Sequence, residues 1–223
     1  MGATHVPADR AANLSTSIFL TTSLGDGLVI AHVPFVVGVC CSVAVTTGLA
    51  VSILPVEYRF WPSGDDDRKL RGYLLCTRGF LLALFVTAAL DWQSGPLPRL
   101  ASGIVGAAVL AGGLAVAFQG GVDLGEEETR GRIGELRTDG IYRYTRNPQV
   151  VGFVAAFAGT ALLANSVLAG ALAVMVAVWL PLTIVAEEPW LREQYGEAYV
   201  EYCRDVPRFV GLRTVRRVVA VLQ

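Results

Sequence analysis

Five long apolar runs divide the chain. They span residues 28–54, 72–90, 100–118, 150–164 and 167–186. Because a helix needs about 20 mainly apolar residues to cross a bilayer, we predict five transmembrane helices. Only Asn165 and Ser166 separate the last two runs, which predicts a tight helical hairpin. The predicted fold is therefore an all-α polytopic membrane protein, with an amphipathic helix in the polar tail at residues 189–223.

Three further observations concern the 119–139 connection, the tail and the third apolar run. Residues 119–139 form a glycine-rich connection, and connections of this length are usually functional or disordered. In the tail, Tyr195, Tyr199 and Tyr202 recur at helical spacing, which is typical of an aromatic belt at the lipid headgroups. Four glycines of the third run would allow another helix to approach closely; they are Gly103, Gly106, Gly112 and Gly113.

The overall composition agrees with a membrane protein. Apolar residues make up 53% of the 223 residues, and mean hydropathy is +0.52. Charged residues make up 17%, against about 25% in a typical soluble domain. The net charge of −1 and the lack of a basic, aromatic-rich patch argue against nucleic acid as a partner. The four cysteines and two histidines form no cluster with metal-ligand spacing, so no metal site is predicted.

Basic residues predict the orientation. Fifteen arginines and lysines fall in residues 57–71, 119–149 and the tail, against two on the opposite side of the five-helix topology. The positive-inside rule then places the N-terminus outside and the tail in the cytoplasm. All basic residues but Lys69 are arginine, a bias typical of GC-rich bacterial genomes, so we expect a bacterial inner membrane.

Two polar clusters would meet at the cytoplasmic ends of the hairpin. In the first, Asn147 and Pro148 are typical of a helix start, where free backbone N–H groups can bind a carboxylate or phosphate. Arg143 and Arg146 add positive charge there, although simple positive-inside anchoring explains them too. The first cluster therefore predicts an anion site, with membrane anchoring as the alternative.

The second cluster is Glu187-Glu188, where the last apolar run ends. Carboxylates at a helix C-terminus oppose the helix dipole by about 0.3–1 kcal/mol each. They therefore need a compensating cation, which is either Arg192 or a cationic ligand. Together the two clusters suit a zwitterionic amino-acid group.

The order and spacing of four motifs carry a resemblance. Residues 140–148 read Gly-Ile-Tyr-Arg-Tyr-Thr-Arg-Asn-Pro, and Glu187-Glu188 follows after the hairpin. Residues 195–202 and 206–209 supply a tyrosine-rich motif and Val-Pro-Arg-Phe. Over about residues 131–210 this pattern resembles the isoprenylcysteine carboxyl methyltransferase family, which is related to the membrane phospholipid methyltransferases.

The resemblance implies that S-adenosyl-L-methionine binds in a cytoplasmic pocket over the last spans. It divides the chain into residues 1–118, with the first three spans, and a cofactor-binding region at 119–223. We assign catalytic roles to Arg146 and Arg208, and substrate contacts to Thr183 and Arg146. The implied cofactor-binding residues are Gly134, Glu135, Leu136, Arg137, Tyr142, Asn147, Pro148, Gln149, Val150, Glu187 and Glu188.

The chain departs from the family pattern in ways that affect the expected substrate. The family often has His at the positions of Gly134 and Asn147, and Tyr at that of Val150. Its prenylcysteine enzymes carry Arg at the position of Thr183, to hold the substrate carboxylate. A hydroxyl cannot replace that bidentate charged contact. We therefore expect a hydrophobic small molecule or lipid as methyl acceptor, and simple prenylcysteines as poor substrates.

Methyl transfer from a sulfonium is an in-line displacement in which the protein mainly aligns the acceptor and excludes water. A carboxylate acceptor needs no base, whereas an amine must first lose a proton, so carboxyl O-methylation is favoured. Two alternatives stay open. Residues 195–207 also echo the tail of NADPH-dependent membrane sterol reductases, although Glu187-Glu188 argues against that function. The other alternative is a non-enzymatic membrane scaffold or transporter subunit.

Overall fold

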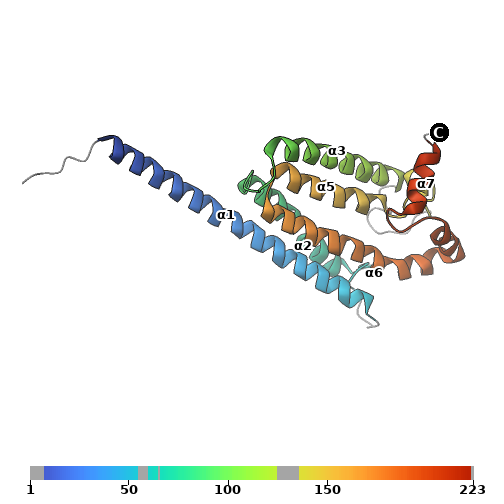
Figure 1. Cartoon of the computed structure of the whole chain (residues 1–223). Coiled ribbons are helices and arrows are strands. Elements are labelled where there is room, and N and C mark those ends of the chain that lie inside the picture. Colours follow the sequence, from blue (N-terminus) through green and yellow to red (C-terminus); the bar gives the residue numbers. More distant parts are fainter. Residues whose placement is uncertain (1–7, 55–59, 65, 125–135, 222–223) are drawn as a thin grey trace, which may run out of the picture.

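The computed structural model describes residues 8–54, 60–64, 66–124 and 136–221, and within these ranges it contains helices and no strand. The long helices pack together as a bundle (Figure 1). Their bounds are α1 Ala8–Ile53, α2 Asp67–Leu90, α3 Arg99–Leu124, the short 3-10 helix η1 Gly140–Arg143, α5 Pro148–Ala164, α6 Val167–Asp205 and α7 Leu212–Val221. The prediction of an all-α fold is confirmed.

Four of the described helices are long and apolar enough to cross a membrane: α1, α2, α3 and α6. The remaining predicted span, α5, is apolar but has 17 residues. At 1.5 Å per residue it is about 26 Å long, slightly less than the hydrocarbon core of a typical bilayer. The structure thus confirms four spans by length and composition, and α5 is a shorter helix within the same bundle.

Helices α3 and α5 pack backbone against backbone, and they run side by side in Figure 1. A Cβ atom added at Gly113 of α3 would lie 2.5 Å from the backbone nitrogen of Ala156, so no larger residue fits there. Gly106 is equally close to α5, whereas Gly103 and Gly112 have open space beside them. The glycine pattern of the third run therefore serves helix packing at two of its four positions.

The α5–α6 turn is the predicted hairpin. Asn165 takes the left-handed conformation (φ 46°, ψ 51°) that ends α5, and the Ser166 hydroxyl accepts the Ala169 N–H to begin α6. That hydroxyl also donates to a carboxylate oxygen of the buried Asp91, at 2.5 Å. The Asn165 amide donates to the carbonyl oxygen of Leu97, at 2.9 Å. The 91–98 loop therefore holds the turn in place.

Helix α6 continues well beyond the predicted membrane boundary at residue 186. It breaks at Gly196 (φ 57°, ψ −135°), and the chain then folds back toward the start of α5. Tyr199, Tyr202 and Val206 form a buried cluster against Leu136. The interpretation of the tyrosines as a headgroup belt is therefore wrong for Tyr199 and Tyr202, because both rings are buried in protein.

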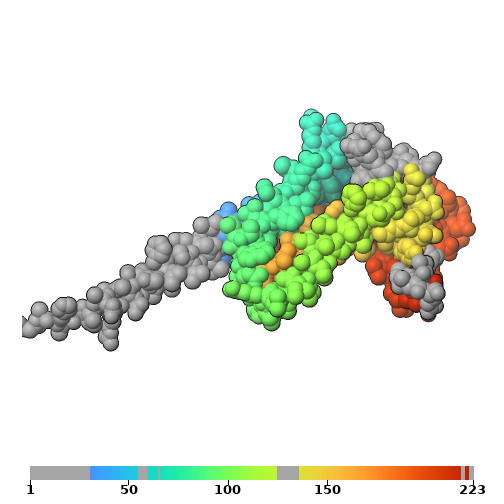
Figure 2. Space-filling model, turned by 90° about the horizontal axis from the view of Figure 1, so that it is seen from above, coloured from blue at the N-terminus to red at the C-terminus, as the bar shows by residue number. Residues whose placement is uncertain are grey.

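Helix α2 and helix α3 meet at the loop that joins them and diverge from there (Figure 2). Asp66 caps the far end of α2 by accepting the Arg68 and Lys69 N–H groups. This cap explains one residue of the aspartate run at 65–67, and Asp65 lies outside the described residues. After α6, the amphipathic α7 carries Leu212, Val215 and Val219 at helical spacing. It lies within the tail for which an amphipathic helix was predicted, although the aromatic spacing behind that prediction falls in α6.

Candidate functional site

The segment 140–147 is built on the end of α3. Gly140 takes a positive φ of 57°, and a Cβ there would collide with the Asp123 carboxylate, so this position requires glycine. That carboxylate accepts the Ile141 N–H at 3.0 Å. The Tyr142 hydroxyl donates to the carbonyl oxygen of Gly120 at 3.2 Å, and burial raises the pKa of this hydroxyl. Both contacts fix the segment above the α3–α5 pair.

The C-terminal tail holds the same segment from the other side. The Arg146 N–H donates to the carbonyl oxygen of Pro207 at 3.0 Å, and the Asn147 side-chain amide donates to that of Arg208 at 2.9 Å. The Tyr202 hydroxyl donates to the carbonyl oxygen of Tyr142 at 2.8 Å. Two motifs that are about 60 residues apart in sequence are thus one structural unit.

Asn147 and Pro148 begin α5 in a way that the sequence predicted only in part. Pro148 occupies the first turn, as expected. Asn147 stands at the capping position, but its side chain makes no capping hydrogen bond, because its amide group is turned to the tail. Its role is therefore to join α5 to the tail.

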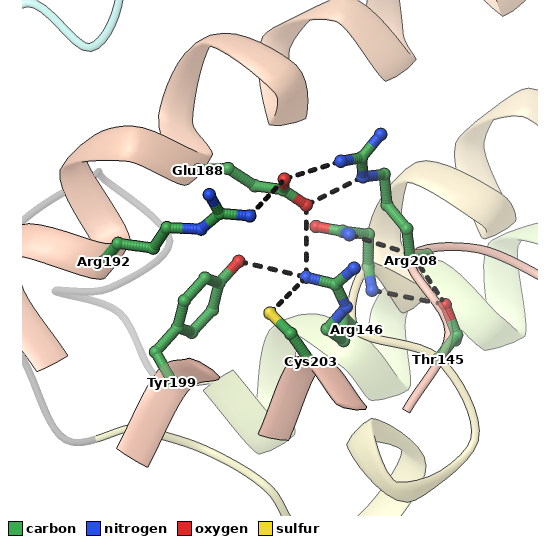
Figure 3. Close-up of polar contacts among 8 residues, drawn as sticks. Thr145, Arg146, Glu188, Arg192, Tyr199, Cys203 and Arg208 are labelled. Carbon is green, nitrogen blue, oxygen red and sulfur yellow. Dashed lines mark hydrogen bonds and ion pairs between the residues drawn. The ribbon is translucent and has the colours of Figure 1, made fainter. Parts of the chain in front are cut away.

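Glu188 is the centre of a cluster of arginines (Figure 3). Arg208 binds its carboxylate with two nitrogens, at 2.7 and 2.6 Å. Arg146 donates to it at 3.1 Å, and Arg192 lies 3.9 Å away. The Glu188 side chain is only 7% exposed, so these contacts compensate a nearly buried charge. The hydrogen bonds from Arg208 to the Glu188 carboxylate also raise the pKa of Arg208.

Arg146 reaches two further groups in this cluster. The same guanidinium nitrogen lies 3.4 Å from the Tyr199 hydroxyl and 2.6 Å from the Cys203 sulfur (Figure 3). The Nε of Arg146 is buried and makes no hydrogen bond within the described residues. Arg146 therefore keeps one donor unused while its charge is already compensated by Glu188.

Glu187 faces a different side of α6 from Glu188, because successive residues of a helix are about 100° apart. It lines a cavity of about 550 Å³. The indole N–H of Trp61 donates to its carboxylate, and the Trp61 ring stacks on Tyr73 with centroids 4.1 Å apart. The two adjacent glutamates thus have separate places: Glu188 in an ion-pair cluster and Glu187 on a cavity wall.

Most of the residues predicted for the site line this cavity. They are Leu136, Arg137, Tyr142, Arg146, Asn147, Gln149, Val150, Thr183 and Glu187. Pro148, Glu188 and Arg208 do not line it, and Glu188 and Arg208 instead bind each other beside it. Gly134 and Glu135 lie outside the described residues. The cavity therefore brings together the motif at residues 140–148 and Glu187. These are about 40 residues apart in sequence and are separated by the α5–α6 hairpin, and such convergence is typical of a binding site.

Sequence reasoning missed several residues of the cavity wall. Trp61 comes from the loop before α2, and Tyr73 comes from the first turns of α2. Trp190 and Tyr195 come from the part of α6 just before its break at Gly196. Arg78 of α2 also lines the cavity. A charged residue inside an apolar run was the only sequence signal for this wall, because intramembrane charges tend to face a cavity or the bundle interior.

The cavity has a polar end and an apolar end. Near the segment 140–147 it is lined by Arg137, Tyr142, Asn147 and Glu187. Deeper in the bundle its walls are Leu74, Phe153 and Leu180, next to Thr183. The Thr183 hydroxyl donates to the carbonyl oxygen of Leu180 at 2.6 Å, so it is already engaged within its own helix. Such a cavity fits an amphiphilic ligand.

Comparison with known proteins bears on the same part of the chain. Residues 101–198 match the model of the family described as Phospholipid methyltransferase. The chain is also 38% identical over 74 residues to Protein-S-isoprenylcysteine O-methyltransferase B of Arabidopsis thaliana. The resemblance to this methyltransferase family is confirmed. No solved structure matches the chain.

The matched stretch covers 33% of this chain and 38% of the plant protein. The family match includes α5, most of α3 and α6 up to residue 198. It therefore contains Tyr142, Asn147 and Glu187 of the cavity wall. The part of the cavity wall that α2 forms, with Tyr73 and Arg78, lies outside the family match.

Proposed function

We propose that this protein is an integral membrane methyltransferase that uses S-adenosyl-L-methionine and methylates a hydrophobic or lipid-like acceptor. The observation that carries the proposal is the Glu187 carboxylate on the wall of a cavity that also includes residues of the segment that resembles the methyltransferase motif. An anionic group in such a place suits a cationic ligand. The family resemblance makes the ammonium and sulfonium of S-adenosylmethionine the best candidates.

The residues present fit this cofactor. The cavity volume of about 550 Å³ lies within the roughly 300–1,000 Å³ range of small-molecule sites. Glu187 would bind the ammonium group, and Arg137 would bind the carboxylate of the amino-acid portion. Arg146, whose Nε donor is unused, also lines the cavity. The Trp190 and Tyr195 rings offer flat surfaces for a nucleobase.

The chain's own contribution to the reaction is alignment and exclusion of water. When bound, S-adenosylmethionine supplies an electrophilic methyl group. The walls formed by Leu74, Phe153 and Leu180 would keep the acceptor dry and hold its apolar part. A carboxylate acceptor would attack without losing a proton, and no histidine lines the described cavity to act as a base. Carboxyl O-methylation is therefore favoured over amine N-methylation.

A methyl-transfer assay tests this function. Purified protein receives S-adenosylmethionine with a radiolabelled methyl group and one of three acceptors: extracted membrane lipids, a farnesylated cysteine analogue, or soluble cytosolic metabolites. We expect label in the lipid extract and little in the farnesylated analogue. Label only in soluble metabolites would refute a lipid-like acceptor. Failure to bind S-adenosylmethionine, with binding of NADPH instead, would replace the methyltransferase by a reductase.

We further propose that the polar end of the cavity faces the cytoplasm of a bacterial inner membrane, with five spans and residues 119–223 as the cofactor-binding region. The positive-inside bias supports this orientation. Membrane lipids then surround the bundle, which leaves many large apolar side chains exposed on α1, α2 and α3. A lipid-like acceptor would reach the deep end of the cavity from the bilayer.

Cysteine labelling tests the orientation at two exposed positions, Ser94 in the α2–α3 loop and Thr138 before η1. We expect an impermeant maleimide to label Ser94→Cys in intact cells and Thr138→Cys only after permeabilisation. The unmodified protein, with its four native cysteines, gives the background. Labelling of Thr138→Cys from outside, with Ser94→Cys protected, would reverse the orientation.

A further inference from the structure

Helix α2 brings one guanidinium group to the cavity wall. Arg78 lies eleven residues after the start of the helix at Asp67, which is about 16 Å along the axis. In the described part of the chain, no hydrogen bond or ion pair joins Arg78 to another residue. By contrast, Arg71 of the same helix lies 3.8 Å from Asp67 and does not line the cavity. Arg78 therefore has its charge and its donors available for a ligand.

The surroundings of Arg78 do not explain its presence. The deep walls of the cavity are Leu74, Phe153 and Leu180, none of which can bind a guanidinium. A charged side chain within a membrane span is costly, and such residues usually face a cavity and bind a partner there. The one carboxylate among the described lining residues, Glu187, accepts the Trp61 indole N–H and forms no ion pair with Arg78. The missing partner is an anion that enters the cavity.

Helix α6 supplies no cation of its own at this depth. Thr183 lies one turn before Glu187, on the membrane side, and its hydroxyl is bound to the Leu180 carbonyl oxygen. The other two arginines of the cavity wall are Arg137 and Arg146, which come from the polar segments near α5. Arg146 is bound to Glu188. Of the described spans, α2 is therefore the one that places a positive charge on the cavity wall.

We propose that Arg78 binds the carboxylate of an amphiphilic methyl acceptor, whose hydrocarbon part lies along Leu74, Phe153 and Leu180. This inference rests on the proposed function and names the substrate class of the same site. A guanidinium binds a carboxylate with two parallel hydrogen bonds, which fixes its plane as well as its position. Arg78 is then a specificity-determining residue. Because it lies on α2 and not at the Thr183 position of α6, it would hold a carboxylate at a different place from the one that prenylcysteine enzymes use, and it lies outside the stretch that matches the methyltransferase family.

The proposed step balances without a base. A carboxylate oxygen forms a bond to the methyl carbon while the bond from that carbon to the sulfonium sulfur breaks. The electron pair of the broken bond stays on sulfur, which becomes a neutral thioether, and no proton moves. Because the product ester is uncharged, it loses the charged contact to Arg78, which favours its release.

Binding of a spin-labelled fatty acid tests the assignment. The protein in nanodiscs is titrated with doxyl-stearic acid, at a pH where the acid is ionised, and with its methyl ester, and bound label is measured by electron paramagnetic resonance. We expect the wild type to prefer the acid at least about tenfold. Arg78→Gln should remove this preference, Arg78→Lys should keep part of it, and the matched control Arg71→Gln on the same helix should keep all of it.

The outcomes that overturn the proposal are specific. An unchanged preference in Arg78→Gln, or a preference that is lost in Arg137→Gln instead, would exclude Arg78 as the carboxylate site. Displacement of the acid by phosphatidic acid but not by unlabelled stearate would show that the anion is a lipid phosphate.

A calorimetric titration with S-adenosylmethionine accompanies each variant. We expect Arg78→Gln to bind the cofactor as the wild type does, which also shows that it folds. If Arg78→Gln loses cofactor binding together with the acid preference, Arg78 belongs to the packing of the bundle and the proposal fails. If the wild type prefers the acid but does not bind S-adenosylmethionine, the proposed function fails, while the anion site at Arg78 stands.

Discussion

Glu187→Gln is expected to weaken binding of S-adenosylmethionine at least about tenfold while the fold stays intact. Glu187 would bind the ammonium group of the cofactor on the cavity wall, where its side chain is half-buried. Removing one partner of such a charge pair costs about 2–5 kcal/mol, and each 1.4 kcal/mol is a factor of ten in affinity. Glutamine has the same shape and can still accept the Trp61 indole N–H. Calorimetric titration of the purified protein measures the change.

The control for this experiment is Glu193→Gln. Glu193 lies on the same helix, is exposed, and does not line the cavity, so the same loss of charge should leave the affinity unchanged. Arg192, which the sequence offered as the partner of the glutamates, lies 3.9 Å from Glu188 and does not line the cavity. Equal affinity of Glu187→Gln and the wild type would remove Glu187 from the cofactor site.

Glu188→Gln is expected to lower the free energy of unfolding more than removal of an exposed charge on the same helix. Breaking a buried ion pair by removing one partner typically costs about 3–5 kcal/mol. The Arg146 side chain is 10% exposed, but that of Arg208 is 40% exposed, so water would partly compensate the charge of Arg208. We therefore expect a loss of about 2–3 kcal/mol in the free energy of unfolding. For a chain of this size, this loss lowers the melting temperature by about 4–12 °C. A thermal melt in detergent measures it.

A matched control lies nine residues further along α6. Glu197 pairs with Arg204 at 3.9 Å, but these side chains are 79% and 71% exposed. Exposed pairs contribute about 0–1 kcal/mol, so Glu197→Gln should change the melting temperature by a few degrees at most. If both variants melt alike, the Glu188 cluster contributes no more than a surface ion pair, and its role in joining α6 to the tail is not supported.

Several features could be predicted because their causes are local. The apolar runs predicted the helices, since the need to satisfy backbone hydrogen bonds in lipid leaves a helix as the only conformation for a single span. The Asn165-Ser166 turn was predictable because both residues are strong helix terminators or starters, and the structure uses both in that way. The family motifs located one polar cluster at the start of α5, as the structure has it. Glu187 and Glu188, predicted at a helix C-terminus, instead lie inside α6, which continues to Asp205.

The length of α5 and the fate of the tail were harder to predict. Close packing against α3 through Gly113 stabilises α5 even though it is shorter than a bilayer is thick. The break at Gly196 turns the tail back, so that Tyr199 and Tyr202 are buried against residue Leu136. Amphipathic spacing alone cannot distinguish a helix face that contacts headgroups from one that contacts protein.

The sequence alone determined that this chain spans a membrane, where its hairpin lies and which polar clusters matter, because hydrophobic runs, turn residues and motifs act over short distances. Only the tertiary structure decided that Glu187 faces the cavity while Glu188 binds Arg146 and Arg208. That choice depends on the rotation of α6, which packing against the rest of the bundle sets. The same packing brings Arg78 of α2 to the cavity beside residues that are distant from it in sequence.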